Sequence, residues 1–331
     1  MIRRTPPPTF YGEIARNRRD SWLLVVVVAL VLAALGAAIG YATGFGWAGV
    51  VVALLVAAVM SVGSYFGGDR LVLLSSGAKR IDLAQPADDQ KQLVNVVTEM
   101  SLAGGLQPPA VYLIDDSAPS AFATGRDPQH ASLAVTTGLL AKMDREELQG
   151  VVAHEMSHIG NYDIRFTLLV GVLVGAIALL ADWFLRFTFW GGGRRSSRDD
   201  RGGGGGGGGG AAILFLIAIV LAILAPIISR LVQLAVSRRR ESLADVSAVG
   251  LTRNPRGLAR ALRTIADDPE VLEVANRATQ HLYIVNPIKS FEQRARSMWD
   301  THPPIAERIA TLDRLAGEMG EPAATIGSHA R

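Results

Sequence analysis

The sequence predicts a mainly α-helical, multi-span membrane protein that carries a small β-sheet. Hydrophobic residues make up 49% of its 331 residues and the mean hydropathy is +0.27, values typical of a chain with several membrane spans. No charged residue occurs from Ser21 to Gly68. Outside the apolar runs, hydrophobic residues recur mostly at the i, i+3, i+4 spacing of helices, and only short stretches have the composition of strands.

The charge-free region is too long for a single membrane span, because a bilayer requires about 20 apolar residues per helix. A group of glycines indicates a turn in the middle of this region: Gly40, Gly44 and Gly46. Two transmembrane helices are therefore predicted at about 22–40 and 47–66.

A second apolar hairpin is predicted further along the chain. Its first helix covers 166–181 and continues past Asp182 to about residue 187, and its second covers 211–228 and continues towards residue 234. Asp182 interrupts the third run, and the segment before it is short for a span. The third run could therefore instead be a re-entrant or interfacial helix.

These spans divide the chain into membrane and soluble parts. The predicted segments are a cytoplasmic tail at 1–20, two transmembrane helices at 21–68, a first soluble part at 69–165, a second hairpin at 166–234 with a Gly-rich loop at 191–210, a second soluble part at 235–317 and a flexible tail at 318–331.

The arginine distribution predicts which side of the membrane each part faces. The N-terminal tail has few acidic residues and many basic ones: Glu13 and Asp20 against Arg3, Arg4, Arg16, Arg18 and Arg19. The positive-inside rule then places this tail in the cytoplasm, and two complete hairpins return both soluble parts to the same side. The absence of cysteine suits a cytoplasmic domain. Four arginines in the loop predicted to lie outside oppose this orientation: Arg194, Arg195, Arg198 and Arg201.

The soluble parts combine helices with a few strands. Predicted helices include one around 93–100 that ends at Gly104-Gly105, one that begins at a capping box formed by Asp144 and Glu147, and one around 258–265. Predicted strands cover 110–114, 121–124 and 132–136, and the last two have the spacing of a hairpin.

Residues 154–158 read HExxH on a predicted helix and carry the strongest chemical signal. Residues four apart share one helix face, so the imidazoles of His154 and His158 can reach one ion. Zinc accepts neutral histidine nitrogens, and a catalytic zinc site has three protein ligands plus water. Glu155 lies beside the first histidine, where its carboxylate can take a proton from that water. The alternative is a chance match on an ordinary amphipathic helix.

A downstream ExxxD pattern supplies a candidate third ligand. Glu241 could complete a His, His, Glu set, which is one of the known catalytic zinc sets. Asp245 lies one helical turn further on and could accept a hydrogen bond from a ligand imidazole. The alternative is that both acids balance the arginines at 238–240 on a solvated face, a common arrangement on helices.

The net charge of +3 is small, and basic residues form no stripe interleaved with aromatic residues. Nucleic acid is therefore not an expected partner. The arginine clusters beside the apolar runs instead indicate anchoring to anionic lipid of the bilayer.

Taken together, these motifs resemble the HtpX family of membrane-embedded zinc endopeptidases, relatives of the CAAX prenyl proteases. The similarity, with the four spans, covers the chain from about residue 20 to 315. The matching segments are 120–126, 134–140, the HExxH helix with Asn161 and Asp163, 237–241 with Ala244-Asp245, and 301–304 with Arg308-Ile309. Two features depart from the family pattern: Ser120 replaces the usual Asn, and nine glycines fill 202–210.

The resemblance implies a gluzincin-type zinc metalloprotease domain fused to plasma-membrane spans. It implies one Zn²⁺ per chain and polypeptide substrates, chiefly misfolded or damaged membrane proteins under stress. It also places His302 near the site as a catalytic residue, whereas the local sequence around it, His-Pro-Pro, predicts only a turn. The expected mechanism has zinc held by His154, His158 and Glu241, with Glu155 moving the proton.

Two other classes of protein remain open from the sequence. A catalytically silent membrane scaffold could keep a structural zinc, although such a site has no need of a base at Glu155. A multi-span transporter would show ionisable residues inside its spans or inverted repeats, and Asp182 alone is thin support for that.

Overall fold

A computed structural model describes residues 47–169, 238–270 and 304–320, together with Arg19, Leu23, Val26, Leu30, Val220 and Leu272. The chain divides into two compact units. The first comprises Met1–Gly68 and Arg165–Ala235, and the second comprises Asp69–Ile164 and Val236–Arg331.

The predicted span at 47–66 falls within helix α2, Trp47–Ser75, which has 29 residues. The other three predicted spans lie almost wholly outside the described residues. Within the ranges that the structure describes, no helix combines the length and the apolar composition that crossing a bilayer requires. The four membrane spans therefore stay a prediction.

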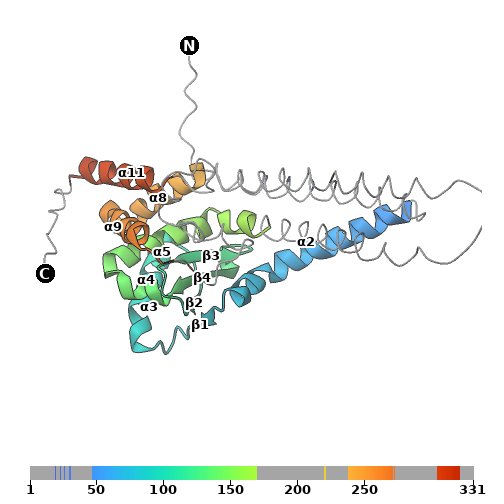
Figure 1. Cartoon of the computed structure of the whole chain (residues 1–331), viewed down its shortest axis with the longest axis horizontal. Helices are drawn as coiled ribbons and strands as arrows, with labels where there is room; N and C mark the ends of the chain where they lie inside the picture. The colour runs from blue at the N-terminus through green and yellow to red at the C-terminus, as the bar shows by residue number, and fades with distance from the viewer. Residues whose placement is uncertain are drawn as a thin grey trace, which may run out of the picture. The chain divides into compact units, whose positions relative to one another are not determined.

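The second unit is mainly helical with one small sheet, as predicted (Figure 1). In chain order its described elements are β1 Lys79–Arg80, η1 Asp88–Gln90, α3 Lys91–Gly104, β2 Ala110–Ile114, β3 Ala121–Gly125, η2 Pro128–His130, β4 Ala131–Thr136, α4 Thr137–Lys142, α5 Arg145–Gly160, α8 Arg238–Thr252, α9 Pro255–Asp267 and α11 Ile305–Glu318.

The sheet has the strand order β1-β2-β4-β3. Strands β3 and β4 pair antiparallel, with Ala121 opposite Val135, and η2 joins them as the predicted hairpin. Strand β2 pairs parallel with β4, so β4 lies between β2 and β3, and the crossover from β2 to β4 contains β3. This crossover places β3 at one edge of the described sheet.

Alternate residues of the strands enter two different hydrophobic clusters. Leu133 and Val135 of β4 belong to the large core that includes the helices, whereas Ala134 belongs to a smaller core with Phe122 of β3. Successive strand residues point to opposite faces of a sheet, so both faces of this sheet are covered. The end of α2 contributes Leu73 to the smaller core.

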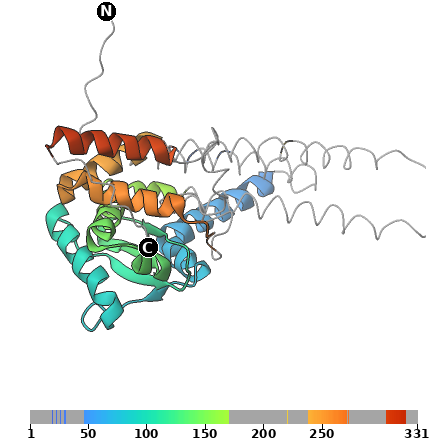
Figure 2. The ribbon, with the colours of Figure 1, turned by 60° about the vertical axis from the view of Figure 1, so that its left-hand side comes forward.

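Helix α5 carries the HExxH segment and lies at the centre of the second unit. Helices α3, α8 and α9 and strand β3 all pack against it, as Figures 1 and 2 show. Its start is fixed by the predicted capping box: Asp144 Oδ1 accepts from the Glu147 amide at 2.8 Å, and Glu147 Oε2 accepts from the Asp144 amide at 3.0 Å. Such reciprocal bonds satisfy two amides that the first turn would leave without partners.

Two glycines allow α5 and α9 to cross closely. A Cβ atom built on Gly150 of α5 would lie 2.6 Å from the backbone nitrogen of Leu258 of α9. A Cβ atom built on Gly257 of α9 would lie 2.6 Å from the carbonyl oxygen of Glu146 of α5. Because neither glycine has a side chain, the backbone of each helix can approach the other closely. This contact holds the HExxH helix in place.

The close crossing predicts that Gly150→Ala destabilises the second unit. The added methyl group would meet α9 backbone, which cannot rotate away, so we expect a loss of about 1–3 kcal/mol, as overpacking usually causes. Thermal unfolding of the purified protein measures it. The matched control is Gly250→Ala in α8, where a Cβ atom would meet nothing within 4 Å. An equal loss in both variants would contradict the close crossing.

Candidate metal centre

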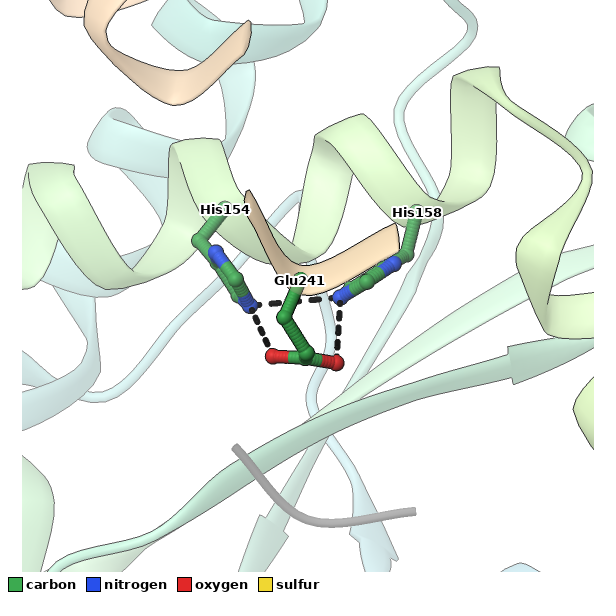
Figure 3. Close-up of side chains that lie close together, drawn as sticks. All are labelled: His154, His158 and Glu241. Atoms are coloured by element: carbon green, nitrogen blue, oxygen red, sulfur yellow. Dashed lines mark hydrogen bonds and ion pairs between the residues drawn. The ribbon is translucent and has the colours of Figure 1, made fainter. Parts of the chain in front are cut away.

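Helix α5 places His154 and His158 one turn apart on the same face. Their Nε2 atoms lie 3.2 Å from one another, and their ring centroids are 4.7 Å apart. Figure 3 shows that both rings direct one nitrogen towards the same point. The side chain of His154 is fully buried and that of His158 is 15% exposed.

Glu241 of α8 closes this arrangement from across the helix pair (Figure 3). Its Oε2 lies 3.5 Å from His154 Nε2, and its Oε1 lies 3.6 Å from His158 Nε2. The fully buried alanines Ala244 and Ala248 on the same helix leave room for α8 to approach closely. The three side chains offer ligand atoms that all lie within 4.8 Å of one another, and no other such group occurs among the described residues.

The contacts of each Nδ1 atom determine whether the Nε2 atom of the same ring can bind a metal. Nδ1 of His154 lies 3.0 Å from Asp245 Oδ1, and Nδ1 of His158 lies 2.9 Å from Asp163 Oδ2. A carboxylate oxygen can only accept, so Nδ1 carries the hydrogen in each ring. In a neutral imidazole, Nε2 then presents a lone pair. Two lone pairs and a carboxylate thus converge, which is the donor set of a metal site.

The electrostatics of this cluster favour a cation. Without a metal, burial opposes protonation of His158, but the hydrogen bond to Asp163 and the charge of Glu241 outweigh it and raise its pKa to about 9. Burial likewise opposes protonation of His154, yet Asp245 and Glu241 raise its pKa as well. His154, His158 and Glu241 would hold a divalent ion in place of these protons. The residues present therefore fit a metal.

Arg308 of α11 adds a buried cation beside the site, which the motif spacing alone does not predict. Its side chain donates to both oxygens of Asp245, from Nε at 2.9 Å and from Nη2 at 2.7 Å. Its Nη1 lies 3.5 Å from Glu241 Oε2. Burial alone would raise the pKa of Asp245, but the Arg308 charge and the hydrogen bonds from His154 and Arg308 lower it to about 2. Asp245 is therefore held as an anion behind His154.

Glu155 lies on the same helix with its side chain buried, at 2% residue exposure. Burial raises its pKa above the ordinary value, and the charge of Glu241 adds to this rise. The charges of the two histidines and a hydrogen bond from the Ala123 backbone amide oppose it. Strand β3 therefore supports the carboxylate through Ala123. A carboxylate with a raised pKa is a stronger base, which suits proton transfer near neutral pH.

The remaining predicted site residue, His302, lies outside the described residues. Ser120, directly before β3, is buried, and its amide donates to Thr136 Oγ1 at 2.9 Å. The sequence motifs predict no role for Asp163 or Arg308, although both stand in segments that carry the family resemblance. An acidic residue five positions after the second histidine was the available signal for Asp163.

Comparisons with known proteins agree with this geometry. The sequence model described as Peptidase family M48 matches residues 87–316. A "Protease HtpX homolog" of Caldanaerobacter subterraneus subsp. tengcongensis is 41% identical over 309 residues, which cover 93% of this chain and 98% of the relative. One of Streptococcus thermophilus is 43% identical over 306 residues, covering 92% and 99%.

A solved structure, that of S. mikatae Ste24p, is 18% identical with a TM-score of 0.47, and covers 89% of this chain and 67% of that chain. That likeness is too low to add to the assignment. The family match and the near-complete coverage of the relatives confirm the resemblance drawn from the motifs. The chain therefore belongs to peptidase family M48, and it is a metallopeptidase.

Proposed function

We propose that this metallopeptidase is a membrane-bound zinc endopeptidase that acts in the quality control of misfolded or damaged membrane proteins. The observation that carries the proposal is the convergence of two imidazole Nε2 atoms and the Glu241 carboxylate beside the buried Glu155. A structural metal site would have no use for this additional carboxylate, whereas a hydrolytic site requires a base. Zinc analysis together with casein hydrolysis by detergent-purified protein tests the proposal.

The donor set favours zinc, held once per chain by His154, His158 and Glu241. Two histidines and one glutamate form a known catalytic zinc set with one open position. Zinc bound there would polarise the scissile carbonyl and lower the pKa of a water molecule. Asp245 accepts from Nδ1 of His154, which would leave the Nε2 lone pair of that ring for the ion.

The proton transfers belong to Glu155. Its carboxylate takes a proton from the attacking water and later gives that proton to the leaving amine. The Ala123 amide orients the carboxylate while it does so. We assign to His302 a hydrogen bond to the carbonyl oxygen as negative charge develops there, a role that acts on turnover and not on zinc affinity.

The third ligand gives a direct test of the centre. Glu241→Ala should lower zinc content and casein hydrolysis together, because it removes one of three ligands. Asp245→Asn should weaken zinc binding less, by about 10–100-fold, as changes behind a ligand usually do. The matched control is Glu99→Ala, which removes an exposed acid paired with Arg145 and should leave zinc content unchanged. Full zinc content in Glu241→Ala would place the third ligand elsewhere.

The membrane part of the proposal is supported by the charge-free run from Ser21 to Gly68 and by helix α2. Large apolar side chains on α2 are exposed: Trp47, Val51, Leu54, Leu55, Val59, Val62 and Phe66. A continuous apolar face of this kind needs apolar surroundings. The bilayer meets this need, and the arginine distribution orients the peptidase unit to the cytoplasm.

Thiol labelling tests this orientation, since the chain contains no native cysteine. Ser197→Cys should react with a membrane-impermeant maleimide in intact cells, because the Gly-rich loop is expected outside. Ser117→Cys should react only after the membrane is opened, although Ser117 is exposed on the protein surface. The opposite pattern would invert the protein in the membrane. No labelling of Ser197→Cys before or after opening would argue against a complete second hairpin.

A further inference from the structure

The two ligand histidines are each backed by a carboxylate, but the two carboxylates reach the site in different ways. Asp245 comes from α8, far along the chain, whereas Asp163 follows the HExxH helix by only a few residues. Asp163 is 3% exposed, and its Oδ2 lies 2.9 Å from His158 Nδ1.

We propose that Asp163 is a positioning residue of the metal centre, which fixes the ring orientation and the tautomer of His158. The proposal rests on the proposed metal centre and extends its ligand-orienting set to the segment directly after α5. It makes the functional motif longer than HExxH: the second ligand and the acid that orients it lie five residues apart.

The backbone after α5 explains how so close a residue can reach the ring. If the helix continued, Asp163 would lie about 140° around the axis from His158, on another face. Instead α5 ends at Gly160, and Tyr162 adopts a φ of 62°. This left-handed conformation is uncommon for a residue with a bulky side chain. It interrupts the helix for two residues, and the chain is helical again from Asp163, whose side chain lies against His158 of the last turn of α5.

The turn is held by hydrogen bonds to the same last turn. The Asn161 amide donates to the Ser157 carbonyl at 2.9 Å, and the Tyr162 amide donates to the Ile159 carbonyl at 3.2 Å. A left-handed non-glycine residue persists only where the surrounding structure fixes it, and such residues cluster at functional sites. Here the left-handed conformation of Tyr162 allows the contact between Asp163 and His158.

Asp163 also connects the two ligand-bearing helices. Its other oxygen, Oδ1, lies 3.8 Å from Arg240 Nε, and Arg240 precedes the third ligand Glu241 on α8. One carboxylate thus faces a ligand of α5 and the neighbour of a ligand of α8. Asp163 therefore contacts both helices that carry the predicted ligands.

A purely structural role makes a different prediction. If Asp163 only joined α5 to α8 through Arg240, its loss would lower thermal stability and leave the zinc affinity of folded protein intact. If it positions His158, its loss weakens zinc binding even in protein that remains folded. Outer partners of metal-bound histidines typically change affinity by about 10–100-fold.

The experiment compares zinc affinity in full-length wild type, Asp163→Asn and Asp163→Ala, by competition with a chelator of known affinity. The thermal midpoint of each metal-free protein is measured in parallel. We expect a loss of about 10–100-fold for Asp163→Ala. The loss should be smaller for Asp163→Asn, whose amide oxygen still accepts from Nδ1 but carries no charge. Asparagine has nearly the same size, so this variant remains informative if the alanine variant does not fold.

The matched control is Asp127→Asn. Asp127 Oδ1 contacts Nδ1 of His130 at 2.7 Å, an equivalent pair outside the metal centre, and its loss should leave zinc affinity unchanged. Wild-type affinity in folded Asp163→Asn and Asp163→Ala would overturn the positioning role. Failure of the metal centre itself gives a different result, because wild type would then bind no zinc or Glu241→Ala would bind it as tightly.

Discussion

Glu155→Gln should retain zinc and lose almost all hydrolysis of casein. The amide has the size of the carboxylate and can still accept from the Ala123 amide, but it cannot take a proton from water. The three predicted ligands are untouched, so metal content should stay near that of wild type. Loss of a general base typically lowers the rate by about 10²–10⁴-fold. Zinc content per chain and turnover, measured on one preparation, check both parts.

The matched control for this change is Glu99→Gln, which neutralises an exposed acid of α3 that pairs with Arg145. It should keep both zinc and turnover. Near-normal turnover in Glu155→Gln would remove Glu155 as the base. Loss of zinc in that variant would instead mean that the buried carboxylate helps to hold the metal, and the assignment of roles within the motif would have to change.

Local signals were enough to predict the elements that carry the site. The capping box formed by Asp144 and Glu147 predicted the start of α5. The Gly104-Gly105 pair predicted the end of α3, which ends at Gly104 and is followed by Gly105 with a φ of 61°. The three predicted strands agree with β2, β3 and β4 to within one residue at each end. These features depend only on residues that are close together in the sequence, so local sequence patterns are sufficient to predict them.

The order of the strands could not be predicted in the same way. Strand β2 pairs with β4 and not with its neighbour β3, and the two-residue strand β1 adds to the other edge of β2. No local pattern distinguishes these pairings, because they depend on how the sheet buries both faces against helices that are distant in sequence.

The same distinction separates the parts of the metal centre. The spacing of His154 and His158 determines that they share a helix face, and the known ligand sets suggest Glu241. Asp163 depends on the left-handed conformation of Tyr162, for which a non-glycine sequence gives no warning. Arg308 depends on how α11 docks against α8, a contact between segments 63 residues apart at Asp245. Both are products of tertiary structure.

Arg308→Met should be among the most destabilising single changes in the second unit. Arg308 is 4% exposed and holds α11 to α8 through two hydrogen bonds to Asp245. Methionine fills similar space but leaves the Asp245 charge buried without its cation, next to Glu241. Removing one partner of a buried ion pair typically costs about 3–5 kcal/mol. Arg308→Lys should lose less, because it keeps the charge but not the paired donors.

The control is a second ion pair of α11, which joins this helix to α9 and not to α8. Arg263 of α9 pairs with Asp313 of α11, and their side chains are 44% and 48% exposed. Arg263→Met therefore removes an ion pair to α11 in water, and such pairs contribute about 0–1 kcal/mol. Urea unfolding of both variants in metal-free protein compares the two effects directly. If Arg308→Met lowers the free energy of unfolding no more than Arg263→Met does, then the buried ion pair contributes no more to stability than the exposed one. Apolar packing, and not the Arg308–Asp245 pair, would then anchor α11 beside the metal centre.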